Sequence, residues 1–281
     1  MGIFSKNYDR PGPGVSKDEP KKKGIERFVE LLLREFSDLV KLNLLFCLFA
    51  APSAVFFTLG LFGVGGFYVF ILSAAAAFPI GGAVAACMFC TVKMLRDDPG
   101  YLIFEFKRKF RENVLQTAWP GILSAVFTYT QLYVWANMLF GFIPASYGTM
   151  ALLVVAAVFI GMITPYFFLQ AAHLELKNFQ LIKNSVFLAI KSAPKSFCGM
   201  LLGQAIFIVS FLLFPLSLWW TPFLLLIGFA VSRLITLMWI WPGVDEVFAI
   251  NDALNSMREQ KTDGVETIFS AREPTDARAL Y

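Results

Sequence analysis

Few residues in this 281-residue chain have types and spacing that could do chemistry, and the clearest group is the cysteine pair Cys87 and Cys90. A tetrahedral zinc site needs about four ligands, and no second pair or other ligand lies near these two, so we expect them to be packing residues. His173 is the only histidine, so a two-histidine metal site is excluded and any Ser-His-Asp triad would have to use it. The sequence therefore predicts a non-enzymatic protein with no catalytic residue, metal site or cofactor.

Arg233 is the exception, because it is the only charged residue between Lys195 and Asp245. It lies about eleven residues after Pro222, which at about 1.5 Å per residue is roughly 16 Å into a bilayer. A charge at that depth costs at least about 2.5–3.5 kcal/mol. Either Arg233 snorkels or bonds freed carbonyls, or it binds an anionic group or a partner's carboxylate. No Asp or Glu lies inside any predicted span, which argues against a pump driven by protons or sodium.

The composition places these residues in a membrane protein. Hydrophobic residues make up 57% of the chain and charged residues 16%, whereas soluble globular proteins carry roughly 25% charged residues. The 31 Phe and 6 Trp could not all be hidden in one water-soluble core. An ordinary soluble enzyme, a disordered chain and a secreted disulfide scaffold are therefore excluded. We expect an all-α, polytopic bundle of transmembrane helices.

Three windows of the sequence lack charges almost completely: 42–92, 113–174 and 196–244, the last interrupted only by Arg233. One spanning helix needs about 20 apolar residues, so each window can hold two spans joined by a turn, and Gly or Pro residues lie near the middle of each. The sequence therefore predicts three hairpins, with six spans near residues 42–59, 67–92, 115–139, 149–171, 197–214 and 222–241.

The distribution of Lys and Arg predicts the orientation of these spans. Nine lie in 1–41, six in 93–111, four in 177–195 and four in 258–278, whereas the turns on the other side have none. Cationic loops stay in the cytoplasm, so both termini are expected there. Residues 1–23 then form a flexible cytoplasmic tail, 24–243 the membrane domain and 244–281 a cytoplasmic C-terminal tail.

Three cytoplasmic segments have apolar residues at helical spacing opposite charged residues: Ile25–Lys41, Tyr101–Glu112 and Leu174–Lys191. They are expected to lie along the anionic inner leaflet of the bilayer, or to form a docking platform for another protein. In the docking alternative, Phe106 and Phe110 would be the aromatic anchors, one helical turn apart. The small net charge of +4 favours contact with a membrane surface rather than with nucleic acid.

Residues 79–113 resemble the signature of the YesL-like bacterial membrane family, a domain of unknown function (number 624). The resemblance begins with Pro79 and the small residues after it, and it continues through a basic and acidic turn to a Phe-rich helix and an Asn. It rests on Pro79, Gly81, Gly82, Ala83, Ala86, Lys93, Asp97, Asp98, Phe106, Phe110 and Asn113, with Leu42-Asn43 upstream. It extends over about residues 25–245, although this chain has extra residues at about 53–78 and longer tails.

The resemblance implies an accessory or assembly component of a bacterial carbohydrate-uptake ABC transporter, in the plasma membrane and in contact with permease subunits. It implies no reaction. The alternative is a small transporter or channel for a sugar-like or neutral solute, and a homo-oligomer is compatible with either. The candidate binding residues are Arg233, Asn43, Pro79, Gly81, Gly82, Phe106, Phe110 and Asn113. A sugar path in the alternative would use Asn43, Gln116, Gln131, Asn137, Gln170 and Gln204, with Trp119 and Trp135.

Overall fold

The computed structural model describes residues 24–98, 100–144, 146–252 and 256, and these residues form helices joined by short turns, with no strand among them. The predicted tail 1–23 and most of the predicted tail 244–281 lie outside the described residues. In chain order the helices are α1 (Gly24–Arg34), α2 (Phe36–Leu61), α3 (Gly66–Ala76), α4 (Ile80–Arg96), α5 (Leu102–Asn113), α6 (Ala118–Leu139), α7 (Tyr147–His173), α8 (Asn178–Lys191), α9 (Ala193–Leu212), the 3₁₀ turn η1 (Leu216–Trp219), α10 (Thr221–Phe223), the π-helical turn η2 (Leu224–Gly228) and α11 (Phe229–Phe248).

Five helical segments among the described residues are long and apolar enough to cross a membrane. They are Phe36–Leu61, Gly66–Arg96, Tyr147–His173, Ala193–Leu212 and Thr221–Phe248. Each contains most or all of one predicted span, so the all-helical class and the multi-pass character of the chain are confirmed to this level. The large apolar side chains of these helices are widely exposed, as expected where lipid rather than water surrounds them.

The sixth predicted span, 115–139, corresponds to α6, which is helical over 22 residues but is not among the five apolar segments. The helix carries no charge, yet Thr128, Thr130, Gln131 and Asn137 lower its mean hydropathy. The six-span count therefore remains a prediction.

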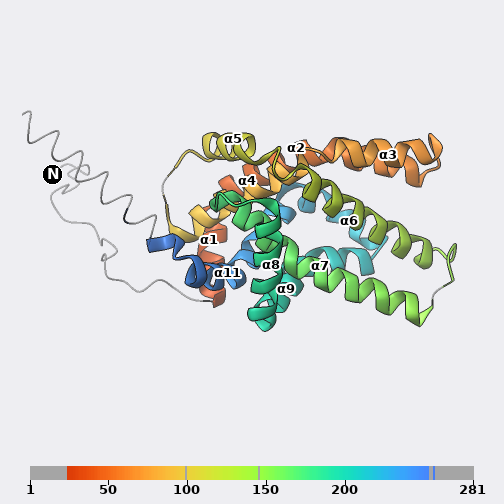
Figure 1. Ribbon diagram of the computed structural model, residues 1–281. Coiled ribbons are helices and arrows are strands. Elements are labelled where there is room, and N and C mark those ends of the chain that lie inside the picture. Colours follow the sequence, from red (N-terminus) through yellow and green to blue (C-terminus); the bar gives the residue numbers. More distant parts are fainter. Residues whose placement is uncertain (1–23, 99, 145, 253–255, 257–281) are drawn as a thin grey trace, which may run out of the picture.

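The helices form an elongated molecule in which the pairs α2–α3 and α6–α7 project toward the same end, where their connecting turns lie (Figure 1). Helices α1 and α5 and the last part of α11 lie toward the opposite end (Figure 1). Helices α2 and α3 are tied together by Ser53 and Ser73, each of which donates a hydrogen bond of 2.8 Å to the other's carbonyl oxygen. The hydroxyl of Tyr129 in α6 reaches Ser53 Oγ at 3.0 Å, so three helices meet at one small polar contact.

Helix α4 lies in the middle of the packed part of the molecule, and every residue from Gly81 to Met88 is buried. One side of α4 packs in an apolar cluster with residues of α7, α8 and α11. The other side packs in a second cluster with residues of α1, α2, α5 and α11. Helices α4 and α11 contribute to both clusters, so they join the two halves of the core.

Three helix ends and breaks lie at positions other than those that the sequence predicts. The predicted span 67–92 is divided at Pro79, because a proline lacks the N–H that an uninterrupted helix needs and its ring crowds the preceding turn. The predicted span 222–241 contains the end of α10 and a π-helical turn before α11. Helix α11 continues to Phe248, so the predicted boundary at 243 lies inside it. The segment Ile25–Lys41 is likewise two helices, since α1 ends at Arg34 and α2 begins at Phe36.

A first prediction concerns the crossing of α4 and α6. A Cβ added at Gly81 would lie 2.0 Å from the Thr117 carbonyl oxygen, whereas at Gly148 the nearest atom is 3.7 Å away. We expect Gly81→Ala to lower the free energy of unfolding by about 1–3 kcal/mol, because backbone atoms must move apart. The matched control Gly148→Ala should be close to neutral. Thermal unfolding in detergent measures both, and an unchanged midpoint for Gly81→Ala would show that the two helices do not cross this closely.

Candidate functional site

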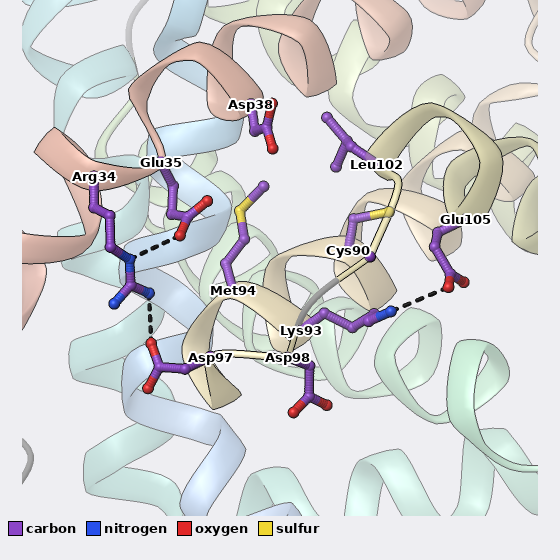
Figure 2. Close-up of a pocket in the computed structure, with 11 residues that line it drawn as sticks. Arg34, Glu35, Asp38, Cys90, Lys93, Met94, Asp97, Asp98, Leu102 and Glu105 are labelled. Carbon is purple, nitrogen blue, oxygen red and sulfur yellow. Dashed lines mark hydrogen bonds and ion pairs between the residues drawn. The ribbon is translucent and has the colours of Figure 1, made fainter. Parts of the chain in front are cut away.

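A charged pocket lies between the α1–α2 junction, the C-terminal end of α4 and the start of α5, with a volume of about 340 Å³ (Figure 2). Its lining carries five carboxylates and two basic side chains. The lining residues are Arg34, Glu35, Asp38, Cys90, Lys93, Met94, Asp97, Asp98, Gly100, Leu102 and Glu105. The sequence-based candidates do not line this pocket.

The turn after α4 creates one wall of the charged pocket. Asp97 caps α4 in the left-handed conformation, with φ of 61°, and the Asp98 N–H donates to the Lys93 carbonyl oxygen at 2.9 Å. This turn presents the Asp97 carboxylate to α1. There Arg27 Nη2 donates to both oxygens of Asp97, at 2.8 and 2.7 Å, and also to the Leu95 carbonyl oxygen at 3.3 Å. Arg27 is 8% exposed, so this ion pair is an internal contact of the fold.

Arg34 lies seven residues after Arg27 and therefore on the same face of α1. Its guanidinium also contacts the Asp97 carboxylate. Arg34 donates to Asp97 and, at 2.8 Å, to Glu35 (Figure 2). Partial burial acts to lower the pKa of Arg34, but the hydrogen bonds to Asp97 and Glu35 outweigh it and raise the pKa above its ordinary value. Arg34 therefore stays charged, and Asp97 holds two guanidinium groups of α1.

The remaining carboxylates of the pocket are also paired with basic groups. Glu105 accepts from Lys93 at 3.0 Å (Figure 2) and from Arg108. The other pairs are Asp38 with Lys41 at 2.8 Å and Asp98 with Arg96 at 3.4 Å. Within the described residues no group of three or more His, Cys, Asp or Glu side chains could hold a metal ion. The pairs of Asp97 and Glu105 fasten α1 and α5 to the end of α4, whereas the Asp38–Lys41 pair lies within α2.

Asn43 is fully buried and bonds backbone atoms within and just after the π-helical turn that precedes α11. Its Nδ2 donates to the Leu225 carbonyl oxygen at 2.6 Å, and its Oδ1 accepts from the Ala230 N–H at 3.0 Å. A π-helical turn shifts the backbone hydrogen bonds by one residue, and lipid offers no replacement partner. The contacts therefore give Asn43 a structural role between α2 and η2.

Arg233 extends from the mostly buried side of α11, one turn after Phe229. Its guanidinium lies 4.6 Å from the centre of the Phe229 ring, and that ring stacks on Phe46 at 3.5 Å. The Nε atom is buried and has no hydrogen-bond partner in the described part of the chain. Desolvation of a donor in this way is costly, so Arg233 remains a candidate for contact with an anion.

The contacts align Arg233 with the start of α2. Asn43 bonds Ala230 and lies two residues after Lys41, whose ammonium marks the charged end of α2. Arg233 follows Ala230 by three residues in the antiparallel helix, which moves it about 4.5 Å back toward the level of Lys41. Arg233 therefore lies near the charged end of the molecule. These contacts fix no bilayer level, so the depth of roughly 16 Å into a bilayer stays a prediction of the sequence.

Pro79, Gly81 and Gly82 lie where the backbone of α4 approaches the α5–α6 junction. Pro79 directly precedes α4, and a Cβ at Gly82 would lie 2.9 Å from the Val114 Cα. Gly121 in α6 faces Gly81 in the same manner, since a Cβ there would lie 2.4 Å from the Gly81 nitrogen. Only glycine permits such an approach, so these positions serve helix packing.

Phe106, Phe110 and Asn113 are directed into the protein. Phe106 is 3% exposed, and Phe49 of α2 stacks on Phe110 at 4.4 Å and on Phe106 at 6.1 Å. Asn113 is buried and donates to the Lys109 carbonyl oxygen of its own helix at 2.8 Å. In this conformation the two Phe rings are packed inside and do not present an aromatic anchor to another protein.

The amides expected along a sugar path bond backbone atoms at separate places, Asn137 and Gln170 within their own helices, and the amide oxygens of Gln131 and Gln170 have no partner among the described residues. Each of five donates to a backbone carbonyl oxygen, and the pairs are Asn43 with Leu225, Gln116 with Leu176, Gln131 with Leu153, Asn137 with Tyr133, and Gln170 with Tyr166. Gln204 and Trp135 are half-buried, and Trp119 is exposed. These residues are therefore not brought together around one described cavity.

Sequence reasoning missed the pairing of Arg27 with Asp97. The available signal was the seven-residue spacing of Arg27 and Arg34, which puts both on one face of α1, together with the acidic turn after a basic helix end. Comparisons with protein-family models, curated proteins and solved structures found no match.

A second prediction concerns Asn43. Asn43→Leu should leave the Leu225 carbonyl and the Ala230 N–H without their side-chain partner, which lowers the free energy of unfolding by about 1–3 kcal/mol. Asn137→Leu is the matched control, since its amide bonds only the Tyr133 carbonyl of its own helix, and it should have a smaller effect. Thermal unfolding of both variants in the same detergent makes the comparison. Equal midpoints would contradict a clamping role for Asn43.

Proposed function

We propose that this chain is a non-enzymatic accessory or assembly component of a bacterial carbohydrate-uptake ABC transporter system. The carbohydrate and transporter parts of the proposal come from the resemblance to YesL-like proteins. The structural support is the use of polar groups: the carboxylates of the charged pocket are ion-paired. Of these pairs, Arg27–Asp97 and Lys93–Glu105 join different elements, and carboxylates paired in this way are poorly placed to bind a solute or catalyse a reaction.

The proposed setting is the bacterial plasma membrane, with both termini in the cytoplasm and six spans arranged as three hairpins. This orientation follows from the Lys and Arg distribution of the sequence. It puts the charged pocket on the cytoplasmic side, where the nucleotide-binding subunits and inner surface of an ABC permease are found. The α6 helix would be the least apolar of the six spans.

A transporter or channel for a neutral, sugar-like solute is the second candidate, and one feature favours it. The helix breaks at Pro79 and at Leu224–Gly228 resemble the discontinuous helices that form substrate sites in transporters. Against it, Asn43 already satisfies the backbone at the second break. Accordingly, the accessory function is the stronger proposal.

Co-purification tests the accessory function. The tagged full chain, solubilised from its host membranes in mild detergent, should carry ABC permease subunits in near-stoichiometric amount. A tagged, unrelated multi-pass protein from the same membranes is the control for non-specific recovery. A monodisperse preparation without permease subunits, from cells that express the permease, would contradict the proposal.

Arg233 can be tested in the same experiment. If its guanidinium serves a partner's carboxylate, Arg233→Leu should abolish permease recovery while the protein remains inserted and monodisperse. Arg233→Lys is the matched control, because it retains the charge but loses the planar contact with Phe229. Full recovery with Arg233→Leu would assign Arg233 to snorkelling or internal contacts alone.

A further inference from the structure

Helix α1 presents three apolar side chains outward and holds Arg27 inward, although Glu26 and Arg34 are also exposed. Ile25 is 81% exposed, Val29 44% and Leu33 73%, whereas Arg27 is 8% exposed and Leu31 is fully buried. The three exposed residues are spaced by four, so they form one stripe along α1. An exposed apolar stripe of this kind requires a covering phase or partner.

Ion pairs cause this orientation. Arg27 and Arg34 both bind Asp97, so the charged face of α1 is held against the end of α4. With that face fixed, the helix periodicity forces Ile25, Val29 and Leu33 to the outside. The orientation thus depends on contacts inside the protein and would be the same before any partner arrives.

The stripe continues onto the exposed surface of α2. Phe36 at the start of α2 is 46% exposed, and Leu44 and Leu48 follow at 49% and 67%. Helix α2 is one of the segments long and apolar enough to cross a membrane, so these side chains are its lipid-facing surface. Continuity with that surface points to lipid as the phase that covers α1.

The sequence before α1 suits a bilayer surface as well. Lys21, Lys22 and Lys23 directly precede Gly24. Clusters of Lys beside an amphipathic helix are attracted by anionic head groups, at about 1 kcal/mol per residue near the surface. An apolar stripe next to a cationic segment is the combination found in helices that lie in the membrane interface.

We propose that α1 is an interfacial helix whose Ile25–Val29–Leu33 stripe is inserted among the lipids of the inner leaflet while Arg27 and Arg34 fasten its other face to Asp97. Helix α1 thereby lies between the charged pocket and the lipids of the inner leaflet. This inference concerns lipid contact and does not depend on the transporter partner.

Site-directed spin labelling tests the proposal. Cys47 and Cys198 are replaced by Ala, while Cys87 and Cys90 are buried at 1% and 2% exposure and are not labelled. Single labels are placed at Leu33→Cys, at Leu48→Cys as the lipid reference and at the exposed Lys107→Cys as the aqueous reference. The full chain is reconstituted in vesicles of phosphatidylethanolamine and phosphatidylglycerol. Collision rates with oxygen, which partitions into lipid, and with a water-soluble nickel chelate are compared.

The oxygen-to-nickel ratio at position 33 should approach that at position 48 and exceed that at position 107 several-fold. A ratio at position 33 like that at position 107 would overturn the proposal, because α1 would face water. Low collision rates with both reagents at position 33 would also overturn it, since protein would then cover the stripe. That protein would be another segment of this chain or a second copy.

Discussion

The π-helical turn Leu224–Gly228 depends on a side chain from a different helix, because lipid cannot supply hydrogen-bond partners for a shifted backbone. Asn43 provides both a donor and an acceptor to this turn. The contact sets the position of α11 against α2, and α11 in turn packs on α4, which joins the two apolar clusters of the core. The stacking of Phe46 on Phe229 and the location of Arg233 follow from the same alignment.

The need to satisfy polar groups inside the protein also limits what the protein can bind. The polar groups of Ser53, Gln116 and Gln170 bond atoms of neighbouring segments and so stabilise helix contacts, which leaves Gln170 Oε1 as an acceptor without a partner among the described residues. The carboxylates of the charged pocket are engaged by ion pairs. Among the described residues, exposed apolar side chains remain accessible, and such a surface suits association with lipid and with other membrane proteins.

The regular features of the fold could be predicted because they depend on local composition. Long charge-free windows correctly predicted helices at α2, α7 and α9, and Pro79 and the glycines beside it were recognised as special positions. Features that depend on distant partners could not be predicted. The burial of Arg27 requires Asp97, 70 residues away, and the role of Asn43 requires Leu225 and Ala230, 182 and 187 residues away. The contact of Arg233 with Phe229 and its level beside the start of α2 likewise depend on tertiary alignment.

Solute flux tests most directly the claim that the polar groups of this chain hold helices and do not form a pathway. The purified full chain, reconstituted alone in vesicles, is supplied with radiolabelled mono- and oligosaccharides, and uptake is compared with that of protein-free vesicles. The account predicts uptake equal to that of the protein-free vesicles at every sugar concentration. Saturable uptake that requires the protein would contradict it and would identify the chain as a transporter in its own right.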